Sequence, residues 1–301
     1  MICETQTAVA TNSFIKFDVW DYPGQLDWEP EFDMTAVLEQ CGAIIWVCDA
    51  QEDYDESLTR FLNTVALAHN VNPEIQFVFF VHKVDGMSDD HKIHLYESII
   101  SDYTRALRDA HMEEVQVEPH LTSIYDHSIF EAFSKVIQKM VPQLAVLESL
   151  LDTFNATSGL ERTFLSDMAT KIFLATDRTG HDEYKYDLCS DMMDLVADVL
   201  SIYQASAPGE PPCVESEIRL GSGIVLYLYA VTPQLVLLCL VREATFAKRG
   251  LLSYNFDCLR RALVAILELQ EHDPAAVSEL LTQNPAYGFL PESSPQAANF
   301  V

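Results

Sequence analysis

Three residues near the amino terminus have the types and spacing of a phosphate-binding motif. Asp21 follows the apolar segment FIKFDVW, and Gly24 and Gln25 complete the pattern D-x-x-G-Q. An Asp at the end of a strand can hold Mg²⁺, a Gly lets its backbone N–H approach a phosphate closely, and a Gln can orient an attacking water. The motif indicates nucleotide chemistry, although a strand that ends in a Pro-Gly turn has the same letters.

A second group of polar residues follows two later apolar segments. His82, Lys83 and Asp85 come after IQFVFFV, and Ser123 and Ile124 come after EPHLT. An Asp carboxylate can accept hydrogen bonds from the N1–H and 2-amino groups of guanine, a pair that adenine lacks, and a Lys stem can cover the base. The order D-x-x-G, K-x-D, T-S-I therefore favours a guanine site. Each residue alone has another interpretation. His82 could be a strand-end histidine that bonds within the protein, and Lys83 could be a solvated surface charge.

A sheet must bring these strand ends together, and the apolar pattern predicts one. Residues 14–20 alternate between apolar and polar, as in a strand with one side in solvent. Residues 43–48 and 75–81 are continuously apolar, as in strands buried on both faces of a mainly parallel sheet. The other predicted elements are a helix from Asp55 to Ala68, a helix over 88–112, a strand over 115–121 and a helix over 129–140. The alternation predicts a doubly wound α/β domain over residues 1–144.

Residues 145–272 predict a second domain, of the α+β class. Its predicted elements are a helix over 149–157 ended by Gly159, one or two strands over 163–176, a helix over 192–202, strands over 223–231 and 234–241, and a helix over 256–270. The remaining residues, 273–301, are rich in Pro, Ala and Ser, and they predict a flexible tail.

The composition excludes several classes of function. The 301 residues carry 18 basic and 46 acidic side chains, and the formal net charge of −28 repels nucleic acid and anionic lipid. The chain has no apolar run of about 18 residues and no basic-then-apolar start. We therefore expect a cytoplasmic protein that binds no nucleic acid and does not insert into a membrane. Seven cysteines without a C-x-x-C pair predict reduced core thiols.

Two other pairs of reactive residues could be taken for a metal site or for a nucleophile with its base. His91 and His94 are spaced as metal ligands on a helix can be, but without a third ligand they favour a solvated helix face. Ser123 and His127 would be a nucleophile and its base, yet Ser123 lacks the G-x-S-x-G setting of such a nucleophile. Neither grouping predicts a catalytic site.

Four segments carry a family resemblance: WDYPGQ, DAQEDYDESLTR, VNPEIQFVFFVHKVDGMSDDHK and LTSIYDHSIFEAFSKVIQKMVPQL. Together they resemble Rag GTPases of the RagC/RagD type, to which the yeast Gtr subunit belongs, through about residue 270. The resemblance implies a Ras-like G domain, then a roadblock/longin-like dimerisation domain, and pairing with a RagA/RagB-type subunit. It also implies amino-acid signalling to the target-of-rapamycin kinase complex, with peripheral recruitment to a lysosomal or vacuolar scaffold.

The resemblance also assigns roles to individual residues. Around bound GTP or GDP, Asp85 would read guanine, Lys83 would pack on it beside His82, and Ser123 and Ile124 would support it through their backbone. Asp21 would lie near Mg²⁺, Gly24 at the γ-phosphate and Gln25 at the attacking water. The dimerisation region would include the two strands bounded by Gly223 and Val231, and by Gln234 and Val241.

One departure from the family pattern leaves two functions open. The motif G-x-x-x-x-G-K-[ST] does not occur, and with it the family's phosphate loop and central first strand are missing. We expect a truncated gene product or gene model rather than a subunit that has lost nucleotide binding. The segment MICETQTAVA is too polar to predict a replacement strand, so we expect a sheet that is open in its middle. The protein is then either a guanine-nucleotide switch or a nucleotide-free scaffold.

Overall fold

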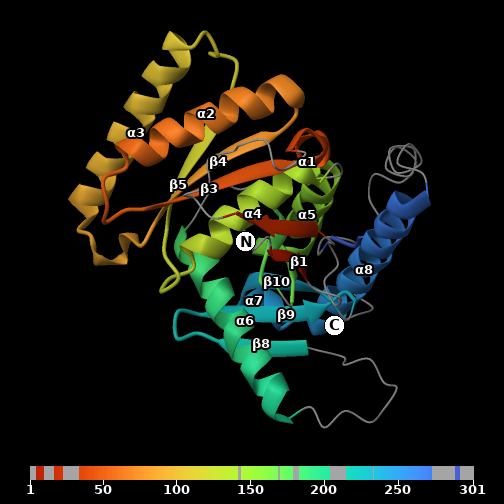
Figure 1. Cartoon of the computed structure of the whole chain (residues 1–301). Helices are drawn as coiled ribbons and strands as arrows, with labels where there is room; N and C mark the ends of the chain where they lie inside the picture. Colours follow the sequence, from red (N-terminus) through yellow and green to blue (C-terminus); the bar gives the residue numbers. More distant parts are fainter. Residues whose placement is uncertain are drawn as a thin grey trace. The chain divides into compact units, whose positions relative to one another are not determined.

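The computed structural model describes residues 5–9, 17–22, 34–141, 144–168, 170–178, 183–203, 215–232, 234–272 and 289–291. These residues form two compact units (Figure 1). The first unit contains Thr5 and the described residues of 20–140. The second contains those from Val141 onwards, together with most of β1 (Thr5–Val9) and β2 (Phe17–Asp21).

A parallel sheet of three strands forms the middle of the first unit. Its order is β3 (Ala43–Asp49), β4 (Gln76–His82), β5 (Val117–Thr122). The central strand β4 is buried on both faces, because each residue from Phe77 to Val81 is at most 3% exposed. The continuously apolar run over 75–81 is therefore confirmed as an interior strand of a parallel sheet.

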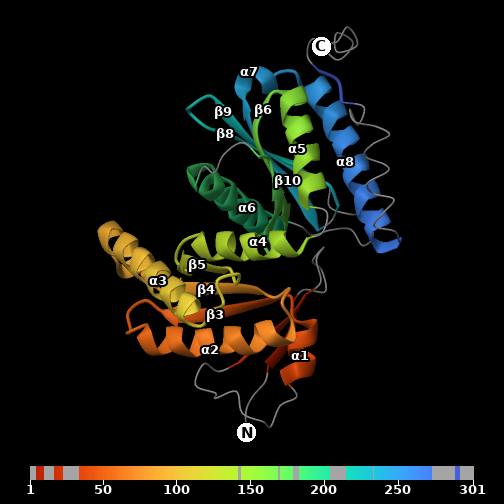
Figure 2. The ribbon, with the colours of Figure 1, turned by 90° about the horizontal axis from the view of Figure 1, so that it is seen from above.

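Helices cover both faces of this sheet. The helices are α1 (Met34–Gln40), α2 (Asp55–Val71), the 3₁₀ turn η1 (Val84–Gly86), α3 (Asp89–Asp109) and α4 (Ser128–Met140). Figure 2 shows α2 and α3 on one side of the sheet and α4 on the other. Phe61 and Val65 of α2 are fully buried, and the ring of Phe61 lies 5.2 Å from that of Phe79. On the other face, Val136 of α4 packs with Phe80. The mixed α/β class is thus confirmed.

The amino-terminal strands depart from the prediction in one respect. Residues 5–9 form strand β1, which pairs with β2 in a separate two-stranded sheet. We did not predict a replacement strand in this segment; it does form a strand, because Thr5, Thr7 and Val9 are β-branched and favour extended backbone. Neither strand joins the sheet of β3, and in the described part of the chain β4 is the only strand beside β3.

The second unit contains an antiparallel sheet of five strands in the order β7-β6-β10-β9-β8. The strands are β6 (Leu160–Asp167), β7 (Phe173–Thr176), β8 (Glu215–Arg219), β9 (Ile224–Ala230) and β10 (Leu235–Arg242). The helices are α5 (Leu144–Ser158), α6 (Glu183–Tyr203), α7 (Glu243–Phe246) and α8 (Arg249–His272). In Figure 2, α5 and α8 lie side by side on one face and α6 lies on the other.

Alternation along β9 separates the two cores of this unit. Leu226 and Leu228 point to α6, where they join the core that contains Met192 and Met193. Tyr227 and Tyr229 point to α8, and both rings contact Phe256. This period of two is what an antiparallel strand covered on both faces requires.

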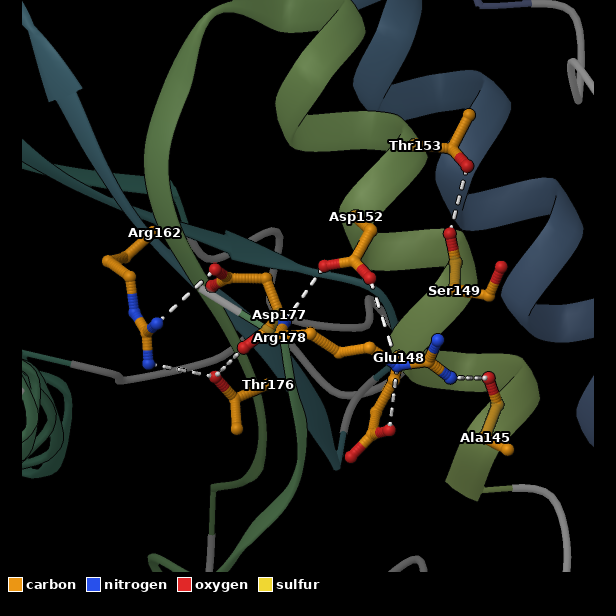
Figure 3. Close-up of polar contacts among 9 residues, drawn as sticks. All are labelled: Ala145, Glu148, Ser149, Asp152, Thr153, Arg162, Thr176, Asp177 and Arg178. Atoms are coloured by element: carbon orange, nitrogen blue, oxygen red, sulfur yellow. Dashed lines mark hydrogen bonds and ion pairs between the residues drawn. The ribbon is translucent and has the colours of Figure 1, made fainter. Parts of the chain in front are cut away.

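The turn after β7 is tied to its neighbours by two arginines (Figure 3). Arg162 of β6 pairs with Asp177, whose side chain is fully buried, with 3.4 Å between Nη1 and Oδ2. The backbone N–H of Arg178 donates to Asp152 of α5 at 2.8 Å, and its Nε donates to Glu148 at 3.2 Å. The amino-terminal half of α5 is therefore fixed to the end of β7.

The sequence predictions for the carboxyl end of α5 and for the cysteines agree with the structure. Gly159 has φ of 68° directly after α5, which is the left-handed position where a helix commonly ends on glycine. None of the five cysteines within the described ranges forms a disulfide, and four of them are buried. Burial raises the pKa of the Cys239 thiol to about 12, so this thiol stays protonated as a core side chain.

Candidate base-binding site

The parallel register places three residues in one row at the carboxyl edge of the first sheet. Asp49 of β3 is the register partner of His82, and His82 is the register partner of Thr122 of β5. In open α/β sheets this edge is where the loops hold ligands. The residues that follow these strands, Lys83 to Asp85 and Ser123, therefore lie close to one another.

Asp85 and Ser123 are brought together as the sequence predicts. The Ser123 hydroxyl donates to Asp85 Oδ1 at 2.7 Å and accepts from the backbone N–H of Tyr125 at 3.1 Å. Ser123 is fully buried, and Val84 beside Asp85 is 3% exposed, so both sides of the pair are anchored in the core. The Asp85 carboxylate is consequently held in one orientation although Asp85 itself is exposed.

The start of α4 holds Ser123 from the other side. The Ser123 backbone N–H donates to Ser128 Oγ at 2.9 Å. Asp126 in turn accepts from the Ser128 backbone N–H at 3.0 Å and from its hydroxyl. This turn projects Ile124 outwards, where its side chain is 68% exposed beside the Asp85 pair. Ser128 and Asp126 were not among the predicted site residues.

Lys83 is held by a residue that the sequence analysis did not single out. Its backbone has φ of 68° and ψ of 38°, a left-handed conformation that is uncommon for a non-glycine residue. Its ammonium forms an ion pair with Asp49 Oδ2, and Asp49 Oδ1 accepts from the Gln51 backbone N–H at 2.9 Å. The ion pair lowers the pKa of Asp49 and raises that of Lys83. Asp49 ends an apolar strand, as Asp21 does, and that position was the available signal.

His82 has a partner inside the protein. Its Nδ1 hydrogen-bonds to Thr122 Oγ1 at 3.0 Å, and Thr122 is fully buried. The contact joins the ends of β4 and β5, and His82 thus has the partner that a strand-end histidine would have. The two strands whose loops carry Lys83 and Ser123 are tied at this point.

The phosphate-side residues are only partly placed. Asp21 is exposed at the end of β2, and Gly24 and Gln25 lie outside the described residues. Within those residues, no three His, Cys, Asp or Glu side chains gather as a metal site would require. His91 and His94 are both exposed on α3.

The family of the chain follows from comparison with known proteins. A family model described as the Gtr1/RagA G protein conserved region matches residues 2–193. The chain is 46% identical to Ras-related GTP-binding protein C of Homo sapiens over 266 residues, which cover 87% of this chain and 67% of the relative. The chain belongs to the Gtr/Rag family of G proteins.

Two further relatives show the same type of Gtr/Rag protein. Ras-related GTP-binding protein D of Mus musculus is 46% identical over 87% of this chain and 60% of its own length. GTP-binding protein gtr2 of Schizosaccharomyces pombe is 44% identical over 85% of this chain and 84% of its own length. The predicted resemblance to the RagC/RagD type is confirmed. Among the described residues, no helix of this Gtr/Rag chain is both long and apolar enough to span a membrane.

The dimerisation region predicted for this Gtr/Rag chain needs correction. Val231 and Val241 are each 1% exposed, and β10 has β6 and β9 as neighbours, so these residues belong to the core of the unit. A central strand has no free backbone edge to offer to a partner. Gly223 and Gln234 instead lie in the turns before β9 and before β10. The side chains of Val231 and Val241 are therefore not available to a partner, whereas the prediction for Gly223 and Gln234 stays a prediction.

We expect the Asp49 carboxyl to titrate below the ordinary range of an Asp, because the Lys83 ammonium and the Gln51 N–H donate to it. A lowered folded-state pKa means that the ion pair contributes stability above the unfolded-state pKa and loses it as the pH falls through the folded-state pKa. Lys83→Met should raise the Asp49 pKa, whereas Lys139→Met, which removes a comparable ion pair with Glu118, should not. A ¹³C NMR titration of the Asp49 carboxyl carbon towards acid pH measures this pKa in both variants. If the Asp49 pKa in Lys83→Met equals that in the parent protein, the ion pair is refuted.

Proposed function

We propose that this chain is the guanine-nucleotide-binding subunit of a Rag-type heterodimeric GTPase. Its partner is a RagA/RagB-type subunit, and its output is the signalling of amino-acid sufficiency to the target-of-rapamycin kinase complex. The protein acts from the cytoplasm and is recruited peripherally to the lysosomal or vacuolar membrane through its partners. Membership of the Gtr/Rag family supports each part of this proposal.

The observation that carries the nucleotide part is the geometry of Asp85. Its Oδ1 accepts from the buried Ser123 hydroxyl, and this contact fixes the carboxylate before any ligand arrives. Guanine presents two adjacent N–H donors, and a carboxylate held in one orientation can accept both without further ordering. Lys83 lies two positions before Asp85 on the same loop, where Asp49 holds its ammonium and the aliphatic stem remains available to the face of the base. Together these residues suit a guanine better than an adenine.

A different observation supports a second candidate, a nucleotide-free scaffold subunit. The motif G-x-x-x-x-G-K-[ST] does not occur in the 301 residues, and β2 is not part of the sheet that contains β3. A base alone contributes only part of the affinity for GTP, because the triphosphate is normally held by the backbone and Lys of that motif. In this second function the chain would act through heterodimerisation only.

Both candidates require a surface on the second unit that pairs with the partner. Helix α6 presents Leu195 and Val199, which are 53% and 45% exposed, one turn apart on its outer side. The inner side of the same helix contributes Met192, Met193 and Val196 to the core. We therefore assign the outer side of α6 to the subunit interface.

Co-expression of the full chain with a RagA/RagB-type subunit tests the pairing. We expect an equimolar complex in size-exclusion chromatography, and we expect Leu195→Glu with Val199→Glu to weaken it roughly tenfold or more, because two charges would be buried without partners. The matched control is Leu67→Glu on α2, which changes a leucine that is 44% exposed in the other unit. If both proteins elute as monomers at micromolar concentration, the heterodimer is refuted. An intact complex with the double variant would instead refute the α6 interface.

A further inference from the structure

A buried asparagine on α8 holds a short segment from the carboxyl-terminal region. Asn255 is fully buried, and its Oδ1 accepts from the backbone N–H of Leu290 at 2.8 Å. Its Nδ2 donates to the backbone carbonyl of Leu290 at 3.0 Å and to Ser158 Oγ at 3.1 Å. These contacts use the acceptor and both donors of the amide. For these three tail residues, 289–291, the prediction of a flexible tail is therefore wrong.

The amide contacts the backbone of Leu290 rather than its side chain. In an extended chain the N–H and C=O of one residue point to the same side, so a single carboxamide can pair with both as a neighbouring strand would. Pro291 favours this conformation, because a proline restricts the residue before it to extended backbone. Leu290 itself remains half-buried, whereas Phe289 is 6% exposed.

Phe289 supplies the apolar part of the contact. Its ring centroid lies 5.6 Å from that of Phe154 on α5, and Phe154 in turn lies 5.0 Å from Phe256 on α8. Phe256 follows Asn255 directly, so the polar and apolar contacts come from neighbouring positions. An aromatic ring that enters such a cluster gains from edge and tilted contacts as well as from burial.

We propose that Asn255, Ser158 and Phe154 form a docking site for an extended peptide of the pattern aromatic-x-Pro, and that residues 289–291 of the same chain occupy it. The occupant belongs to the same chain because the connection is long enough. From Asn255 to the helix end at His272 the α8 axis rises about 25 Å. The 17 residues from His272 to Phe289 can span up to about 55 Å when extended.

The site has a consequence for the second unit. The docked segment contacts α5 through Phe154 and α8 through Asn255, so it joins the two helices that cover one face of the sheet. When the segment leaves, two hydrogen-bonding groups of a buried amide lose their partner, and that loss favours capture of a new peptide backbone. A peptide of the same pattern from outside therefore competes with the chain's own segment.

Two substitutions in the segment separate backbone recognition from side-chain packing without altering the core. Leu290→Pro removes the N–H that donates to Asn255, whereas Leu290→Ala keeps both backbone groups. The readout is solvent exchange of the Asn255 side-chain amide hydrogens, measured by NMR on the full chain. We expect L290P to accelerate this exchange at least about fivefold and L290A to leave it within about twofold of the parent. Equal exchange in the parent and both variants would overturn the proposal, and so would equal acceleration by both.

A synthetic peptide of residues 286–294, AYGFLPESS, tests the site directly. Added to the L290P variant, it should restore slow exchange of the Asn255 amide, whereas the same peptide with Pro at position 290 should not. Failure of the first peptide to restore protection would overturn the docking site. Dilution of the parent protein identifies the occupant: unchanged protection supports docking within one chain, and protection that disappears on dilution would show exchange between copies and overturn it.

Discussion

Replacing Asp85 should abolish the preference for guanine. When the chain is fused behind a segment that supplies G-x-x-x-x-G-K-[ST], we expect Asp85→Ala to weaken GTP and GDP binding at least about tenfold, because two buried donors of the base lose their acceptor. Ser123→Ala should weaken binding less, since it removes only the 2.7 Å contact that orients the carboxylate. Titration of a fluorescent guanine nucleotide measures all three proteins.

The base specificity gives a sharper readout than the affinity. Asp85→Asn replaces an acceptor oxygen by an amide donor, which suits the oxygen that xanthine carries in place of the 2-amino group of guanine. We expect this variant to prefer xanthine nucleotides. Asp90→Ala is the matched control, because it removes the same charge from an exposed position nearby on α3. Unchanged GDP affinity in both Asp85 variants would remove Asp85 from the site and, with it, the nucleotide part of the proposed function.

In the 301-residue chain on its own, we expect the amide exchange rates along β3 to alternate between slow and fast from one residue to the next. At the two ends of its pairing with β4, the N–H of Gln76 donates to the carbonyl of Gly42 and the N–H of Ala50 donates to that of His82. In a parallel pair this pattern assigns the even-numbered residues of β3 to β4 and directs the amides of Ile45 and Val47 to the other edge. Val47 is 60% exposed there.

We expect the amides of Ile44, Trp46 and Cys48 to exchange about 100-fold more slowly than those of Ile45 and Val47. The same chain should bind no measurable GTP. The motif whose backbone and Lys normally hold the triphosphate does not occur in the 301 residues, so the base contacts have no phosphate contacts to add to. The control is the chain fused behind the phosphate-loop segment, in which the two sets of amides should become equally slow. Micromolar GTP binding by the chain alone, with uniform protection of β3, would contradict the open edge.

The local sequence pattern was sufficient to predict which residues come together at the base side of the candidate site. The apolar run that became β4 determined a buried parallel strand, and parallel strands place their carboxyl ends at one edge of a sheet. Asp85 and Ser123 follow two such strands, so their proximity could be predicted before their 2.7 Å contact was seen. The family could be predicted in the same way, because its motifs lie in these loops.

Tertiary structure alone decided the partners of the polar side chains and the order of the strands. The partner of Lys83 is Asp49, which lies 34 positions earlier, and the partner of Leu290 is Asn255, which lies 35 positions earlier. Periodicity describes a local stretch of chain and carries no information on pairing over such separations. For the same reason, Val241 looked like a residue available to a partner, whereas the sheet order places β10 between β6 and β9. The residues of a strand determine that it is apolar, but the neighbours that cover it are supplied by distant parts of the chain.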